Sequence, residues 1–161
     1  MQYLRAPEPG AEGCPLCAYA AAEPSRVSRV LARWPECVVV LNKYPYTSGH
    51  LMVLVRRHRG DIAELEDSEA DQLWKMTHQV SIRLRRATRA QGLNIGVNLG
   101  RAAGAGIEEH LHVHVVPRWD GDCNFMPVLS ETRVIPEYLE DTWDFLWPHF
   151  ADLDSRTEPS R

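Results

Sequence analysis

The sequence predicts one α+β domain built on a five-stranded antiparallel sheet, with one long helix and a C-terminal helix. Five segments show the alternation or the β-branched runs of strands, and two segments show helical periodicity. Their order is strand, strand, strand, helix, strand, strand, helix, which lacks the regular alternation that builds a parallel sheet. The chain has 161 residues, 44% of them hydrophobic, and is therefore long enough to bury one core.

The first half of the chain contains three of the five predicted strands. Residues 29–32 are expected to form a short strand, and residues 36–42 contain the β-branched run expected of a buried strand. Pro45 then requires a turn. In residues 50–56 the aliphatic side chains at alternate positions share one face, as in a strand that packs on a core.

A long amphipathic helix is predicted next, over residues 68–90. Ser68 followed by Asp71 resembles a capping box with the shorter acid, and Gly92 lies just beyond the end of the pattern. The expected buried stripe of this helix is Leu73, Met76, Val80, Leu84 and Ala87. A second helix is expected after Pro136. The apolar residues expected to be buried in it are Leu139, Trp143 and Leu146.

Two further strands flank a glycine-rich loop between the two helices. Residues 93–99 alternate as a fourth strand, and residues 100–106 contain three glycines and form the loop. Residues 110–116 are the fifth strand, which Pro117 is expected to stop because proline cannot donate a hydrogen bond to a neighbouring strand.

Composition and charge indicate a cytoplasmic protein of one domain, residues 1–161. Residues 1–12 and 152–161 are expected to be flexible because they are polar or rich in Pro, Gly and Glu. No segment has the apolar stretch of a signal peptide or of a membrane-spanning helix, so no membrane partner is expected. The net charge of -4 argues against a nucleic-acid partner, since binding to a phosphate backbone needs a clustered cationic surface.

The fifth strand carries three histidines at alternate positions. Residues two apart in a strand share a face, so His110, His112 and His114 are expected along one side. Buried imidazoles need hydrogen-bond partners, so they make a poor core. Exposed surface histidines and a metal site alone are alternatives. Nucleophilic catalysis explains more of this pattern than either alternative, because a neutral imidazole attacks phosphorus well and the neighbouring imidazoles can bind phosphate oxygens.

The glycine-rich loop before this strand suits a phosphate. Glycines let the backbone come close to phosphate oxygens and offer them N–H groups. Gly104, Ala105 and Gly106 are the expected donors. Such a loop is weak evidence alone, but its place just before the histidine strand supports a phosphate pocket.

The run from His110 to Val116 resembles the signature of the histidine triad family, in which three histidines alternate with apolar residues. The resemblance covers residues 14–119 and includes the block at residues 41–53. It implies a five-stranded antiparallel sheet, usually in a dimer, and a nucleotide or dinucleoside polyphosphate as substrate. The roles it implies are His112 as nucleophile of a nucleotidyl-histidine intermediate, His114 and His50 as its flanking histidines, Asn42 on the ribose and Asn98 at the phosphate.

One departure from the family pattern bears on the reaction. Hydrolases of this family commonly carry Gln after the Ala-Gly pair of the loop, whereas here Gly104 is followed by Ala105. The loop and residues 117–125 resemble the branch that includes diadenosine tetraphosphate phosphorylases, in which inorganic phosphate takes the nucleotide from the histidine. The resemblance therefore implies phosphorolysis to ATP and ADP. Hydrolysis of a related nucleotide and non-catalytic nucleotide binding are the alternatives.

Cys14 and Cys17 have the spacing that presents two thiolates to one metal ion, and tetrahedral zinc then needs two more ligands. His58 and His110 are the best candidates, because some histidine triad proteins resemble this chain in joining a cysteine pair to two such histidines. A redox pair is the rival interpretation, but no thioredoxin-like pattern surrounds the cysteines. A closed structural zinc site is expected.

Overall fold

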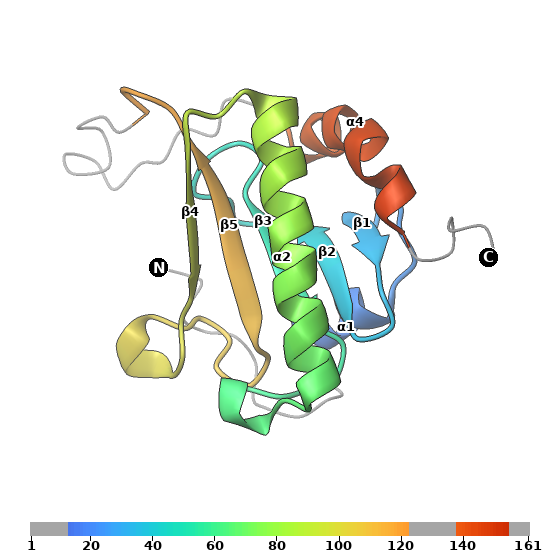
Figure 1. Ribbon diagram of the computed structural model, residues 1–161, viewed down its shortest axis with the longest axis vertical. Helices are drawn as coiled ribbons and strands as arrows, with labels where there is room; N and C mark the ends of the chain where they lie inside the picture. The colour runs from blue at the N-terminus through green and yellow to red at the C-terminus, as the bar shows by residue number, and fades with distance from the viewer. Residues whose placement is uncertain (1–12, 123–137, 155–161) are drawn as a thin grey trace.

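The computed structural model describes residues 13–122 and 138–154 of the chain (Figure 1). Its helices are α1 (Pro15–Ala21), α2 (Asp67–Thr88) and α4 (Leu139–Phe150), with short 3-10 helices η2 (Ile62–Glu64), η3 (Arg101–Ala103) and η4 (Ala151–Leu153). Its strands are β1 (Val30–Arg33), β2 (Cys37–Leu41), β3 (Leu51–Val55), β4 (Gly92–Val97) and β5 (His112–Arg118). Among the described residues, no helix has both the length and the apolar character that crossing a membrane requires.

The five strands form one antiparallel sheet in the order β1-β2-β3-β5-β4. The helix α2 runs along one face of this sheet, with α4 beside it over β1 (Figure 1). The main core lies between them, where Leu73, Met76, Val80 and Leu84 of α2 meet alternate residues of the strands. The short helix α1 packs on β2 and β3, and its Leu16 joins a smaller core on the opposite face.

The predicted architecture is confirmed: five antiparallel strands, one long helix and a C-terminal helix. The α2 stripe is buried as predicted, with Ala87 half-buried at its end. In α4 Trp143 and Leu146 are buried and Leu139 is partly so. The helix α1 was not predicted, because seven residues rich in alanine carry too little periodicity.

Several predicted boundaries are wrong, three of them for reasons that the structure shows. The capping box of α2 is formed by Glu66 and Glu69, so the helix begins at Asp67, one residue before Ser68. Pro117 does not stop β5, because it pairs with Leu93 of β4. The pairing of β5 with β3 ends earlier, at Val115, so the missing N–H of Pro117 removes no hydrogen bond between these two strands. Residues 152–154 are folded rather than flexible, because the indole of Trp34 donates to the Leu153 carbonyl at 2.9 Å.

Candidate functional site

Two of the three triad histidines stand side by side on β5. His112 and His114 share the face of the sheet opposite α2, and their rings meet edge to face with centroids 4.8 Å apart. His110 precedes β5, and its ring lies with the two cysteines instead. The predicted row of three imidazoles is therefore divided, since β5 begins only at His112 and the ring of His110 lies among the cysteines.

The protonation of His112 follows from its hydrogen bond. Its Nδ1 lies 2.8 Å from the carbonyl oxygen of His110, which can only accept, so Nδ1 carries the hydrogen. The lone pair is then on Nε2. Burial lowers the pKa of His112 below the ordinary value, which keeps the ring neutral at pH 7. A neutral imidazole with a free lone pair is the form that acts as a nucleophile.

His114 has the opposite tautomer. This follows from a relay of hydrogen bonds that begins in the loop between β2 and β3. The Tyr46 main-chain N–H donates to Nδ1 of His50 at 3.1 Å, so His50 carries its hydrogen on Nε2. That nitrogen lies 2.9 Å from Nδ1 of His114 and donates to it. His114 must therefore carry its hydrogen on Nε2. Burial, and then the neighbouring His112, lower the pKa of His114 to about 4, so this ring is also neutral at pH 7.

The ring of Tyr46 packs against the two histidines of this relay. The ring of Tyr46 lies against His50 with centroids 4.6 Å apart, and 5.8 Å from the ring of His114. Sequence reasoning missed this residue, because a main-chain donor has no characteristic side chain. The sequence offered one indication of its role: Tyr46 follows Pro45 and therefore lies in the predicted turn.

Of the two expected asparagines, Asn42 contacts His50 and Asn98 contacts the glycine-rich loop. Asn42 is buried, its Nδ2 is 3.3 Å from Nδ1 of His50, and its Oδ1 accepts the Tyr44 N–H at 2.9 Å. Asn98 directly follows Val97, the last residue of β4 to pair with β5, and its Nδ2 donates to the Gly104 carbonyl at 3.4 Å. Asn42 is therefore held against His50, and Asn98 holds the glycine-rich loop beside β5.

The glycine-rich loop is a folded turn that uses several of its own N–H groups. Gly100 and Gly104 both have positive φ, which favours glycine. The Gly104 N–H bonds the Arg101 carbonyl at 2.9 Å, and the Ala105 N–H bonds the Gly100 carbonyl at 3.3 Å. Two of the three expected phosphate donors thus already have partners within the loop. The third, Gly106, is half-buried next to Ala105.

Cys14, Cys17, His58 and His110 form a four-residue cluster that can hold a metal ion. Their ligand atoms all lie within 4.8 Å of one another, with Cys17 Sγ 3.2 Å from His58 Nδ1 and 3.4 Å from His110 Nδ1. Sulfur and nitrogen ligands of a tetrahedral zinc ion lie roughly 3.6 Å apart. The Nε2 of His110 donates to the Val55 carbonyl at 2.8 Å, so its Nδ1 is free to bind a metal. Both the spacing and the tautomer therefore fit a metal.

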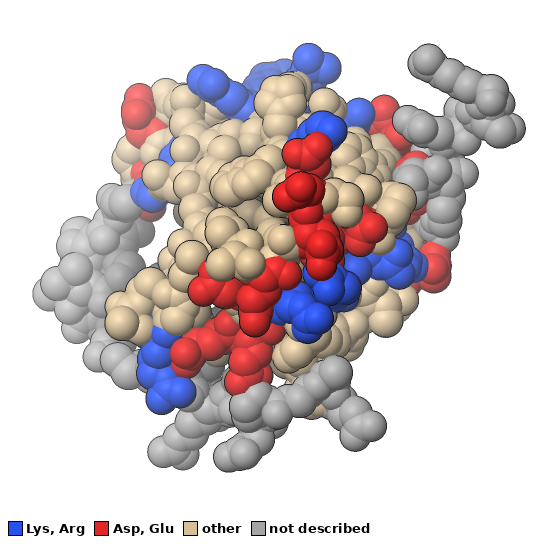
Figure 2. All heavy atoms as spheres, turned by 60° about the horizontal axis from the view of Figure 1, so that its bottom comes forward, with Lys and Arg blue, Asp and Glu red and all other residues tan. Residues whose placement is uncertain are grey.

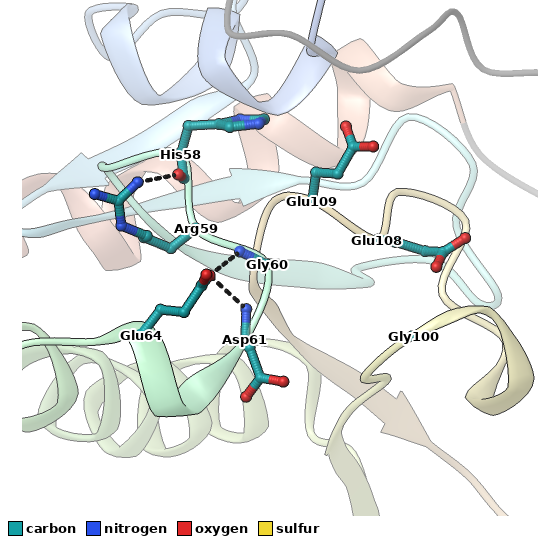
Figure 3. A pocket seen from close by; sticks show the side chains of 8 residues that line it. All are labelled: His58, Arg59, Gly60, Asp61, Glu64, Gly100, Glu108 and Glu109. Atoms are coloured by element: carbon teal, nitrogen blue, oxygen red, sulfur yellow. Dashed lines mark hydrogen bonds between the residues drawn. The ribbon is translucent and has the colours of Figure 1, made fainter.

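A separate pocket of about 430 Å³ adjoins this cluster (Figure 3). Carboxylates dominate its lining. Its lining residues are His58, Arg59, Gly60, Asp61, Glu64, Gly100, Glu108 and Glu109. Acidic side chains also gather on this end of the molecule, with some basic ones among them (Figure 2). Negative lining repels a polyphosphate, so this pocket does not suit a nucleotide, and the histidine face of the sheet is the better candidate.

Comparison with known proteins relates the chain to one family. The HIT domain profile matches residues 24–121. A Mycobacterium tuberculosis protein named AP-4-A phosphorylase is 44% identical over 122 residues, which cover 76% of this chain and 63% of that protein. The match therefore spans less than two thirds of that relative.

Solved structures are similar in fold. A Zn-bound histidine triad family protein from Mycobacterium smegmatis superposes with a TM-score of 0.69 at 24% identity, covering 89% of this chain and 97% of the other. A hypothetical histidine triad nucleotide-binding protein from Sulfolobus tokodaii has a TM-score of 0.68 at 26% identity, covering 87% of this chain and 93% of the other. The antiparallel sheet and its helices are thus a known arrangement.

Proposed function

The chain belongs to the histidine triad (HIT) family, and we propose that it transfers a nucleotidyl group through His112. The reaction we propose is phosphorolysis of diadenosine tetraphosphate to ATP and ADP. One observation carries this proposal: His112 presents a lone pair on Nε2, and His114 beside it presents an N–H on Nε2. A nucleophile next to a hydrogen-bond donor is what attack on a phosphate needs.

The first step is an in-line displacement at the α-phosphorus. A bond forms from Nε2 of His112 to phosphorus, the bond from phosphorus to the bridging oxygen breaks, and its electron pair leaves with ATP. The N–H of His114 stabilises charge on the phosphate oxygens, and His50 keeps that N–H in place. A nucleotidyl-histidine remains, which divides one difficult displacement into two easier ones.

The second step decides between phosphorylase and hydrolase. Inorganic phosphate as acceptor produces ADP, and water produces AMP. The name of the Mycobacterium tuberculosis relative and the Ala105 loop both support phosphate as the acceptor. Hydrolysis of a dinucleoside polyphosphate or of a nucleoside phosphoramidate is the second candidate, since the same intermediate serves both reactions.

The test is to follow the products from diadenosine tetraphosphate with and without added inorganic phosphate. We expect ADP and ATP with phosphate, and a nucleotidyl adduct in the intact mass of enzyme quenched during turnover. The His112→Ala variant should lose turnover by a factor of about a thousand or more and should form no adduct. The exposed His78 provides the matched control, because His78→Ala should behave as wild type. Nucleotide binding without any adduct in the wild-type protein would favour a non-catalytic role and sink the proposal.

We also propose that the cysteine and histidine cluster holds a structural zinc ion. Cys14 and Cys17 come from the start of the described chain, His58 follows β3, and His110 precedes β5. A bound zinc would join these three segments without taking part in the reaction, because all four positions of a tetrahedron are filled by protein. It would also hold the His110 carbonyl where it accepts from His112.

A further inference from the structure

We infer that Gly60 is a positioning residue for the metal cluster: its missing side chain lets the segment that contains His58 lie directly against the segment that leads to His110. This inference rests on the proposed zinc site and deepens it. It explains how two histidines from distant parts of the chain come within reach of one ion.

The chain makes a short excursion from the sheet after β3. In the register of β3 with β5, Val55 would stand opposite Leu111. The Leu111 N–H instead bonds the carbonyl oxygen of Arg59 at 2.6 Å. Residues 56–58 therefore extend outside the regular pairing, and His58 is the last of them.

Gly60 lies where this excursion meets the segment before β5 (Figure 3). A Cβ built on Gly60 would lie 2.5 Å from the carbonyl oxygen of Glu108 and 3.1 Å from the Cα of Glu109. Both atoms belong to the main chain, so neither can turn aside as the end of a flexible side chain could. Such atoms need about 3.5 Å, so a side chain here would force the segments apart by about 1 Å.

Close packing, rather than backbone conformation, calls for glycine at this position. The φ of Gly60 is not among the positive values of the described residues, so another residue could adopt its conformation without strain. The close approach of a second main chain is the other reason for glycine in such a place.

The metal cluster cannot absorb a movement of this size. Metal–ligand distances stay within about 0.2 Å of their preferred values, which is much less than the expected shift. His58 is two residues before Gly60, and its Nδ1 lies 3.2 Å from Cys17 Sγ. His110 is held in place, because its Nε2 donates to the Val55 carbonyl at 2.8 Å. The displacement therefore falls on His58.

The helix α2 holds the other side of the excursion. Arg57, the residue before His58, forms two parallel hydrogen bonds with the carboxylate of Glu69 in α2. Such a pair fixes the geometry of the two groups as well as adding energy. The excursion is thus held between α2 and the main chain at Glu108, and a methyl group on Gly60 strains the segment that places His58.

We expect Gly60→Ala to weaken zinc binding by about tenfold to a hundredfold, the usual effect of residues that orient metal ligands. His58→Ala removes the ligand itself. Adding Gly60→Ala to His58→Ala should cause no further loss, because Gly60 acts through His58. A merely structural role of Gly60 predicts an additional loss in the double variant.

The experiment measures the zinc affinity of each full-length protein by competition with a chromophoric chelator. An osmolyte is present so that weakened variants stay folded, and circular dichroism verifies the fold. Gly92→Ala is the matched control, because its Cβ would make only an ordinary contact, at 3.8 Å with Arg118, and it should bind zinc as wild type does. Cobalt(II) bound in place of zinc gives a second readout, since its visible absorption depends on the ligands: the spectrum of Gly60→Ala should resemble that of His58→Ala.

The outcomes separate this inference from the zinc proposal. Wild-type affinity in Gly60→Ala, or an additive loss in the double variant, would overturn the inference alone. So would a Gly60→Ala protein that remains unfolded in osmolyte, because glycine would then serve folding rather than the metal cluster. A wild-type protein that binds no zinc would overturn the zinc proposal together with it.

Discussion

Acidification from about pH 7 to about pH 5 is expected to lower the free energy of unfolding by about 2 kcal/mol through His114 alone. Burial holds the pKa of this imidazole at about 4 in the folded protein, against an ordinary value of 6.5. Between these two values the unfolded chain binds the proton and the folded protein does not, so stability rises with pH. The stability associated with neutral His114 is complete above about pH 6.5 and is lost as the pH falls toward about 4.

The assay is urea unfolding followed by tryptophan fluorescence at several pH values, since the chain has five tryptophans. His114→Asn removes the titrating group, and its stability should fall about 2 kcal/mol less than that of wild type over this interval. The cluster of Cys14, Cys17, His58 and His110 is the same in both proteins, so its own pH dependence cancels in the difference. Equal pH dependence in wild type and His114→Asn would refute the assignment of a depressed pKa to His114.

Two further predictions concern the metal cluster and a buried charge. Cys17→Ser should reduce bound zinc, measured by elemental analysis of protein purified without chelators, from about one ion per chain to nearly none. Cys37→Ser should keep the metal, because Cys37 lies within a strand and bonds the Gln72 carbonyl; equal metal content in both variants would contradict the site. Arg57→Met should lower the free energy of unfolding, because it leaves the carboxylate of Glu69 without its ion pair. The exposed Arg56 is the control, because Arg56→Met removes a neighbouring arginine that is not paired with Glu69. If Arg56→Met lowers the free energy of unfolding as much as Arg57→Met does, the ion pair with Glu69 is not the cause.

The order of elements could be predicted from the sequence because it depends on local periodicity. Alternation placed His112 and His114 on one face, and the helical spacing from Leu73 to Leu84 identified the buried side of α2. Local patterns were less informative at the edges of elements. The capping box of α2 and the continuation of β5 through Pro117 depend on contacts that the spacing of hydrophobic residues does not reveal.

The protonation states of the site could not be predicted in the same way. Which nitrogen of His114 carries the hydrogen depends on His50, which is 64 residues away in the chain, and on the main-chain N–H of Tyr46. The position of His110 depends on Cys14 and Cys17, more than ninety residues earlier. These contacts exist only once the sheet and the N-terminal helix have come together.

By itself, the sequence determined the succession of strands and helices and the shared face of His112 and His114, because both follow from spacing along the chain. The spacing of Cys14 and Cys17 indicated a metal site, and the resemblance to the family pointed to His58 and His110 as its other residues. The tertiary structure decided which imidazole presents a lone pair and which presents a hydrogen, and how closely two chain segments meet at Gly60. The physical reason is that a tautomer or a close contact depends on which groups lie nearby in three dimensions, and strand pairing brings those groups from distant parts of the chain.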